Sequence, residues 1–118
     1  MLTLLPSVRV FLAVGVTDMR KSFDGCLTEI TRQVIGQDPL SGHLFLFCNR
    51  RRDRIKVLCW DGSGLWLLHK RLEKGTFAWP AVNDRGRAIE LRAEELGLLL
   101  GGLDLKDTTK RHWYQRPA

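Results

Sequence analysis

The sequence predicts a small single α+β domain in which an antiparallel β-meander of three or more strands packs with an N-terminal helix and a C-terminal helix. Three strand-like segments follow one another at residues 43–49, 54–60 and 65–71, and turn sequences separate them. Segments with helical periodicity precede and follow this block. The chain has 118 residues, 44% of them hydrophobic, which suits one domain with its own core.

The amino-terminal part predicts a strand followed by a helix. Residues 8–15, VRVFLAVG, are rich in β-branched and aromatic residues and end at a glycine. Over residues 17–36 the apolar positions change to helical spacing. Thr17 or Asp18 can cap the start of this helix, and Gly36 its end. One face of the helix is formed by Met19, Phe23, Leu27, Ile30 and Val34.

Two turn sequences define the meander. Residues 36–42, GQDPLSG, form a loop before its first strand. Residues 61–64, DGSG, predict a hairpin because their glycines can adopt the positive φ values of tight turns. If this turn pairs Trp60 with Leu65, the second and third strands are in a fixed register.

The carboxyl-terminal part predicts a short extended segment and a helix. Residues 75–80, GTFAWP, leave the sheet at a proline, and residues 87–91 are extended. Leucines at helical spacing then predict a helix within residues 92–105. We assign residues 1–104 to one domain and expect residues 105–118 to form a basic, flexible tail.

Positive charge is concentrated in the central third of the chain. The whole sequence has 19 Lys and Arg against 13 Asp and Glu, a net charge of +6. Residues 43–75 alone carry a net +5, whereas residues 1–42 carry none and residues 76–118 carry +1. Such a balance favours polyanionic partners.

The predicted register gathers these cations at one end of the sheet. It places Lys56 opposite His69 and Arg54 opposite Arg71, and like charges that face each other across strands are destabilising. A DNA phosphate backbone would offset that repulsion, because arginine matches phosphate oxygens in a bidentate geometry. An acidic protein surface and a solvated turn that blocks edge pairing remain alternatives. The predicted DNA-binding residues are Arg50, Arg51, Arg52, Arg54, Lys56, Lys70, Arg71 and Lys74, with Arg20 and Lys21 as additions.

The aromatic residues have two interpretations. They could stack on nucleic-acid bases beside the cations, but their positions in the strand segments favour a core role. The residues in question are Phe45, Phe47, Trp60, Trp66, Phe77, Trp79 and, in the tail, Trp113.

The sequence contains no pattern typical of a catalytic or cofactor site. Its three histidines are scattered, and it has no phosphate-binding glycine loop and no nucleophile elbow. Metal binding by Asp18, Asp24 or Asp61 is the minor alternative, because capping and turn roles explain most of the aspartates. We therefore expect no catalysis, no metal, no cofactor and no small-molecule substrate.

The sequence also predicts a cytoplasmic protein. Three cysteines form an odd set without CxxC spacing, which indicates reduced thiols. The first residues have no basic segment before a long apolar run, so we expect no signal peptide. No apolar run approaches the roughly 20 residues that span a bilayer.

An ordered series of motifs resembles a known family. The motifs DMRK at 18–21, NRRRDRIKVL at 49–58, WDGSG at 60–64, KRLEKG at 70–75 and FAWP at 77–80 resemble the TnpB accessory proteins of the insertion sequence 66 family of bacterial transposable elements. The resemblance covers roughly residues 8–103 and excludes the tail. Those proteins are distinct from the RNA-guided nucleases that share the name TnpB.

The resemblance implies a protein that assists a separately encoded transposase. It supplies no catalytic residues to assign to this chain. We expect a non-catalytic component of a transposition complex that binds DNA, at element ends or target, through the basic end of its sheet. The alternative is an adaptor that docks on the transposase without contacting DNA.

Overall fold

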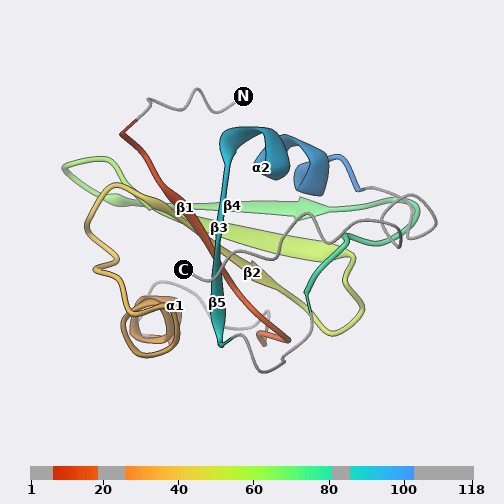
Figure 1. Cartoon of the computed structure of the whole chain (residues 1–118), viewed down its shortest axis with the longest axis horizontal. Helices are drawn as coiled ribbons and strands as arrows, with labels where there is room; N and C mark the ends of the chain where they lie inside the picture. Colours follow the sequence, from red (N-terminus) through yellow and green to blue (C-terminus); the bar gives the residue numbers. More distant parts are fainter. Residues whose placement is uncertain (1–6, 19–25, 81–85, 103–118) are drawn as a thin grey trace.

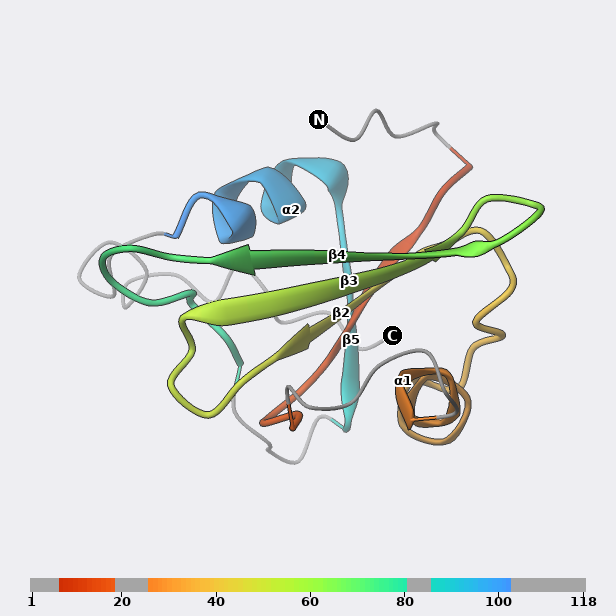
Figure 2. The same ribbon diagram turned by 180° about the vertical axis from the view of Figure 1, so that it is seen from behind.

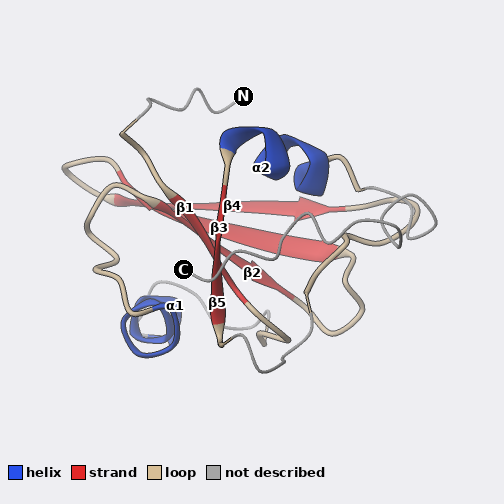
Figure 3. Cartoon of the chain, viewed as in Figure 1, coloured by secondary structure: helices blue, strands red, loops and turns tan. Residues whose placement is uncertain are grey.

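The computed structural model describes residues 7–18, 26–80 and 86–102. A five-stranded mixed sheet with the strand order β4-β3-β2-β1-β5 forms its centre (Figure 1). Two short helical segments lie on opposite faces of this sheet (Figure 3). In chain order the elements are β1 (Val10–Ala13), α1 (Cys26–Ile30), the π-helical turn η1 (Thr31–Ile35), β2 (Leu44–Cys48), β3 (Arg54–Trp60), β4 (Leu65–Arg71), β5 (Ala88–Leu91) and α2 (Ala93–Leu100).

The predicted meander is confirmed, together with its register. Strands β2, β3 and β4 are antiparallel neighbours, and Trp60 pairs with Leu65. The hairpin turn between β3 and β4 is stabilised by Asp61, whose Oδ1 accepts hydrogen bonds from the backbone N–H groups of Ser63 and Gly64 at 2.9 and 2.8 Å. Gly62 has a φ of 103°, which is the conformation that favours glycine.

The meander is only part of the sheet, and this corrects the prediction. Strand β1 pairs with β2 in parallel through the crossover formed by α1 and η1, and β5 pairs antiparallel with β1. The first described element is β1, within the strand predicted for residues 8–15, so the helix called N-terminal in the fold prediction follows a strand and does not begin the domain. The predicted cap residues Thr17 and Asp18 are described and lie outside any helix, and residues 19–25, which separate them from α1, lie outside the described residues. The predicted tail also lies outside them.

Each face of the sheet packs against one helical segment. On the α2 face, Leu96 and Leu99 pack with alternate residues of the strands, such as Leu12, Leu46 and Val57. On the α1 face, the cluster contains Leu27, Ile35, Phe11, Phe45, Phe47 and Leu58. Both faces of the central strands are therefore covered, and β2 is buried over its whole length.

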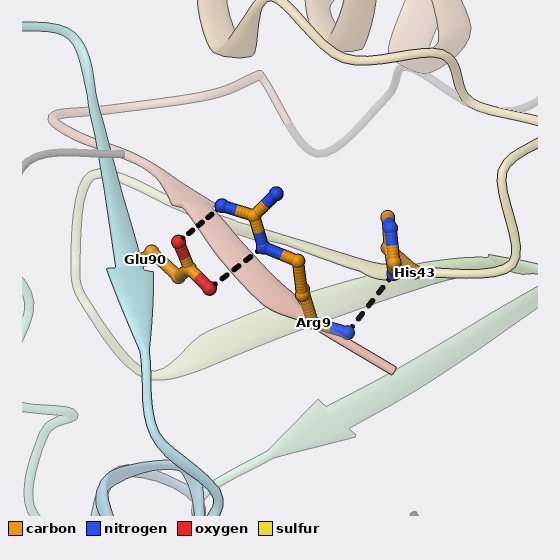
Figure 4. Close-up of polar contacts among 3 residues, drawn as sticks. All are labelled: Arg9, His43 and Glu90. Atoms are coloured by element: carbon orange, nitrogen blue, oxygen red, sulfur yellow. Dashed lines mark hydrogen bonds and ion pairs between the residues drawn. The ribbon is translucent and has the colours of Figure 1, made fainter. Parts of the chain in front are cut away.

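Strand β5 is attached to β1 by an ion pair as well as by backbone pairing. The guanidinium of Arg9 donates to both carboxylate oxygens of Glu90 at 2.6 and 2.9 Å (Figure 4). The backbone N–H of Arg9 donates to Nδ1 of His43 at 2.9 Å. These contacts join the starts of β1 and β2 to β5, which lies at the edge of the sheet.

The segment that follows β4 closes one end of the core. Phe77 and Trp79 are buried on the α2 face. The backbone N–H of Phe77 donates to the carbonyl of Arg52 at 2.6 Å, and the indole N–H of Trp79 donates to the carbonyl of Ala13 at 3.0 Å. The FAWP motif therefore supports the β2–β3 turn and the end of β1, and its aromatic residues have the core role.

Candidate nucleic-acid interface

The arginine-rich segment is an ordered turn between β2 and β3. The side-chain oxygen of Asn49 accepts hydrogen bonds from the backbone N–H groups of Asp53 and Arg54 at 3.1 and 3.0 Å. The Asn49 amide donates to Oδ1 of Asp53 at 2.8 Å. A short polar side chain that bonds the backbone in this way is typical of turns. The arginines therefore project from a fixed backbone.

Two further contacts stabilise this turn from the other side. Arg52 has a φ of 62°, a left-handed conformation that is uncommon for residues other than glycine. Its carbonyl accepts from Phe77, and the carbonyl of Asp53 accepts from the backbone N–H of Leu72 at 2.8 Å. The surrounding hydrogen bonds thus hold Arg52 in a conformation that it adopts at some cost.

The structure gathers most of the predicted cations at one end of the sheet. Arg54 pairs with Arg71 across β3 and β4, as the register predicted. Arg50, Arg51, Arg54, Arg71 and Lys74 are exposed, and Arg52 is half-buried. We call this surface the basic end and define it as Arg50, Arg51, Arg52, Arg54, Arg71 and Lys74.

Few acidic groups oppose the basic end in the described part of the chain. Arg71 pairs with Glu73 at 3.4 Å, and both side chains are exposed. Among the described carboxylates, none forms an ion pair with Arg50, Arg51 or Arg52. The hydrogen bond from Asn49, then the one from its own backbone N–H and the charges of Arg54 and Arg51, lower the pKa of Asp53 from its ordinary value, so this carboxylate is ionised at neutral pH.

Lys56 and Lys70 differ from the other predicted cations. Lys56 is buried, with 9% of its surface exposed, and lies between Phe47 and His69 on the α1 face. Lys70 lies on the opposite face, where its Nζ donates to the carbonyl of Leu100 at the end of α2, at 2.6 Å. A cation at that position complements the helix dipole. Both lysines thus have structural contacts of their own.

His69 responds to the positive charge around it. Its pKa is lowered from the ordinary value, first by desolvation and then by the charges of Lys56, Arg54 and Arg71. These three cations share the α1 face with His69, because side chains alternate along each strand. The lowered pKa is consistent with a positive potential at this end of the sheet.

An open pocket of about 500 Å³ lies beside the arginines. Residues 16–18, which follow β1, line one side. The other side is lined by residues of the β2–β3 turn: Asn49, Arg50, Arg51, Asp53 and Arg54. The backbone N–H of Thr17 donates to the carbonyl of Cys48 at 2.8 Å and so joins the two sides.

The position of the pocket follows from the parallel pairing of β1 and β2. The carboxyl ends of both strands lie at the same end of the sheet (Figure 2). The residues that follow each of these ends line the pocket. In open sheets with parallel strands, ligands commonly bind at this position. Sequence reasoning missed the contribution of Val16 and Thr17, because about thirty positions separate them from the arginines.

Several predictions concern residues with other roles or outside the described part. Arg20, Lys21 and Asp24 lie outside it, as does Trp113. Trp60 is half-buried. Trp66 is 58% exposed, but it lies on the α2 face near the hairpin turn, away from the basic end. Phe45 and Phe47 are buried core residues.

Neither a metal-binding cluster nor a membrane-spanning helix is found among the described residues. No described group of three or more His, Cys, Asp or Glu side chains is arranged to bind a metal ion. Within the same residues, no helix has the length and apolar character needed to cross a membrane. Cys48 and Cys59 are free thiols, and burial raises the pKa of Cys48 to about 12.

Comparison with known proteins agrees with the family resemblance of the sequence motifs. A family model described as IS66 Orf2 like protein matches residues 8–110. The chain is similar to two uncharacterized proteins of Sinorhizobium fredii (strain NBRC 101917 / NGR234). It is 40% identical to y4hO over 104 residues, which cover 86% of this chain and 88% of the relative. It is 36% identical to y4jC over 111 residues, which cover 94% and 92%. No solved structure matches.

Proposed function

Because this chain belongs to the IS66 Orf2-like family, we propose that it is a non-catalytic accessory protein of insertion-sequence transposition that binds DNA through its basic end. The family name links the chain to transposition. The DNA would be an element end or a target, within a complex that contains the element's transposase.

The observation that carries this proposal is the set of exposed arginines on a fixed turn. Arg50 and Arg51 are exposed and form no ion pair with any described carboxylate. Hydrogen bonds to the side-chain oxygen of Asn49 and to the carbonyl of Arg52 order the backbone beneath them. Ordering like charges side by side is unfavourable without a counter-charge, and a phosphate backbone supplies several of them at regular spacing.

Salt dependence of duplex binding tests the proposal. Affinity for a labelled duplex, measured by fluorescence anisotropy, should fall steeply with salt, and replacing Arg51 and Arg54 together by glutamate should abolish binding. Arg51→Gln should reduce the slope of log affinity against log salt by roughly 0.9, the value for one lost phosphate contact.

A matched variant controls for net charge in that experiment. Arg32→Gln also removes one cation, but Arg32 lies on η1, at a distance from the β2–β3 turn (Figure 1). It should leave the slope unchanged. Equal slopes for the Arg51 and Arg32 variants, or undiminished binding by the double glutamate variant, would refute DNA binding through the basic end.

A second candidate function is an adaptor that docks on the transposase without contacting DNA. It is favoured by Trp66, which is 58% exposed while its indole N–H donates to Oδ2 of Asp61 at 2.7 Å. An exposed tryptophan with a fixed orientation is typical of residues that dominate protein interfaces. The two functions are compatible, because Trp66 and the arginines occupy different ends of β3 and β4.

A further inference from the structure

The hollow shape of the pocket calls for a different ligand from an intact duplex. The phosphates of a duplex lie on a convex surface, so exposed arginines on a flat surface would suffice to contact them. Here Arg50, Arg51 and Arg54 instead border a pocket of about 500 Å³. That volume falls within the roughly 300–1,000 Å³ of pockets that hold small molecules. One nucleotide is a ligand of this size.

The lining contains more than phosphate-binding groups. Val16 is 56% exposed and supplies an apolar wall. Asp53 supplies an ionised carboxylate: Asn49 donates to its Oδ1, and among the described residues no side chain donates to its Oδ2. A phosphate alone would be repelled by this carboxylate and by that of Asp18, which also lines the pocket. The carboxylate could accept hydrogen bonds from the amino and imino N–H groups of a base.

We infer that the pocket binds one unpaired nucleotide, at a DNA end or in a single-stranded stretch, and that it prefers guanine. The nucleotide's phosphate would contact the arginines at the rim, and its base would enter beside Val16 and Asp53. Guanine is preferred because its N1–H and N2–H groups are adjacent donors, which match a carboxylate. Thymine presents one such donor between two carbonyl oxygens. Splayed bases are commonly recognised through this edge.

This inference rests on the proposed function, since the same arginines contact the DNA. It adds that the protein distinguishes a frayed or processed DNA end from a continuous duplex. The pocket's location also supports a ligand, because the carboxyl ends of two parallel strands form its walls.

Binding to a series of DNA ends tests the inference. The probes are a blunt duplex and the same duplex with a single unpaired guanine, thymine or abasic nucleotide, made in both strand polarities. The guanine extension of one polarity should bind about tenfold more tightly than the blunt and thymine ends, as expected for one bidentate base contact. The abasic extension should gain less than the guanine extension.

The variant Asp53→Asn isolates the base contact. Its side-chain oxygen can still accept the hydrogen bond from Asn49, so the turn should be kept, and an unchanged thermal melt would confirm this. An amide N–H₂ group would then replace the second carboxylate oxygen. This variant should bind the guanine and thymine ends with about equal affinity, because the bidentate contact to guanine is lost. Ratios between probes are compared within each protein, since this variant also gains net positive charge.

The possible outcomes separate the inference from the function on which it rests. Equal affinity for blunt, guanine and thymine ends, with salt-dependent duplex binding intact, overturns the nucleotide pocket alone. Absence of all DNA binding overturns both. If Asp53→Asn fails to fold, the comparison of the four probes with the unaltered protein still decides.

Discussion

Asn49 is the residue on which the geometry of the arginine turn most depends. Its side chain makes three hydrogen bonds that join the end of β2 to the start of β3. The two bonds to Asp53 are partly buried and the bond from the Arg54 backbone is exposed, so water replaces the first two incompletely when the side chain is removed. The side chain therefore fixes where Arg50 and Arg51 project.

Replacing Asn49 by alanine should lower the free energy of unfolding by about 2 kcal/mol, since two partly buried bonds and one exposed bond are lost. Denaturant unfolding measures this difference. The control is Ser41→Ala, which removes one exposed bond of 3.3 Å to the backbone N–H of His43. The control substitution should lower the free energy of unfolding by about 0.5 kcal/mol or less. Equal destabilisation by the two substitutions would contradict the role assigned to Asn49.

Asp61 should make the stability of the β3–β4 hairpin depend on pH in the acid range. Hydrogen bonds from the Ser63 backbone, the Trp66 indole and the Gly64 backbone lower its pKa to about 2 from the ordinary 3.8. A carboxylate with a lowered pKa contributes stability above the unfolded-state value and loses it as pH falls through the folded-state value. This contribution is therefore complete above about pH 4 and disappears near pH 2.

Thermal melts of the native protein and of Asp61→Ala should differ at neutral pH and converge as the pH falls toward 2. Asp61→Asn serves as the control, because an amide does not titrate. It should lack this acid-range loss. A stability difference between native protein and Asp61→Ala that stays constant down to pH 2 would show that the charge of Asp61 has no part in the hairpin.

At the scale of the elements, the alternation of side chains along β4 separates cations that are adjacent in sequence. Arg71 lies on the α1 face opposite Arg54, whereas Lys70 lies on the α2 face and contacts the end of α2. Sequence reasoning placed both in one phosphate-binding set because it grouped the cations by the end of the sheet. The face to which each belongs decides what it contacts.

Lys70→Gln and Arg71→Gln form a matched pair, since each removes one exposed cation. Lys70→Gln should lower stability by about 0.5 kcal/mol, through loss of the helix-end contact, with little effect on duplex affinity. Arg71→Gln should lower affinity several-fold with little effect on stability, because its exposed pair with Glu73 at 3.4 Å contributes little. Anisotropy and thermal melts on both proteins measure this. The reverse pattern would assign DNA contact to the α2 face.

Local signals predicted the elements well, and the long-range pairing poorly. The DGSG turn predicted the register of β3 and β4 because a two-strand hairpin is determined by its own turn. No such signal joins Phe11 to its partners Phe45 and Glu90, which lie 34 and 79 positions away. In addition, β1 and β2 are buried on both faces, so their apolar runs do not indicate which side faces which helix.

The candidate site was likewise predictable only in part. The cations of the β2–β3 turn were evident from sequence, because they are contiguous. The pocket was not, because one of its walls, residues 16–18, is brought to the turn only by the parallel pairing of β1 with β2. The burial of Lys56 likewise depends on how helix and sheet pack.

For the molecule as a whole, the arrangement of β3 and β4 separates two surfaces of different character. The basic end lies where β4 finishes, and Trp66 lies near where β4 begins. Trp66 and Arg71 are five positions apart along β4, a distance of roughly 17 Å. A macromolecule bound at one surface therefore need not cover the other, so one chain could connect DNA to a protein.

If the two surfaces act independently, substitutions in each should have separate effects. Trp66→Ala should weaken co-purification of the element's transposase at high salt, because loss of the indole removes an apolar contact. It should leave duplex affinity unchanged, because the substitution does not change the charge. Arg51→Glu should reduce duplex affinity and leave that co-purification intact, since salt already screens the charge contacts.

Leu98→Ala controls for loss of exposed apolar surface, as Leu98 is 47% exposed on α2. Retained co-purification by Trp66→Ala would remove the adaptor role from this tryptophan, and loss of both activities in either variant would refute their independence.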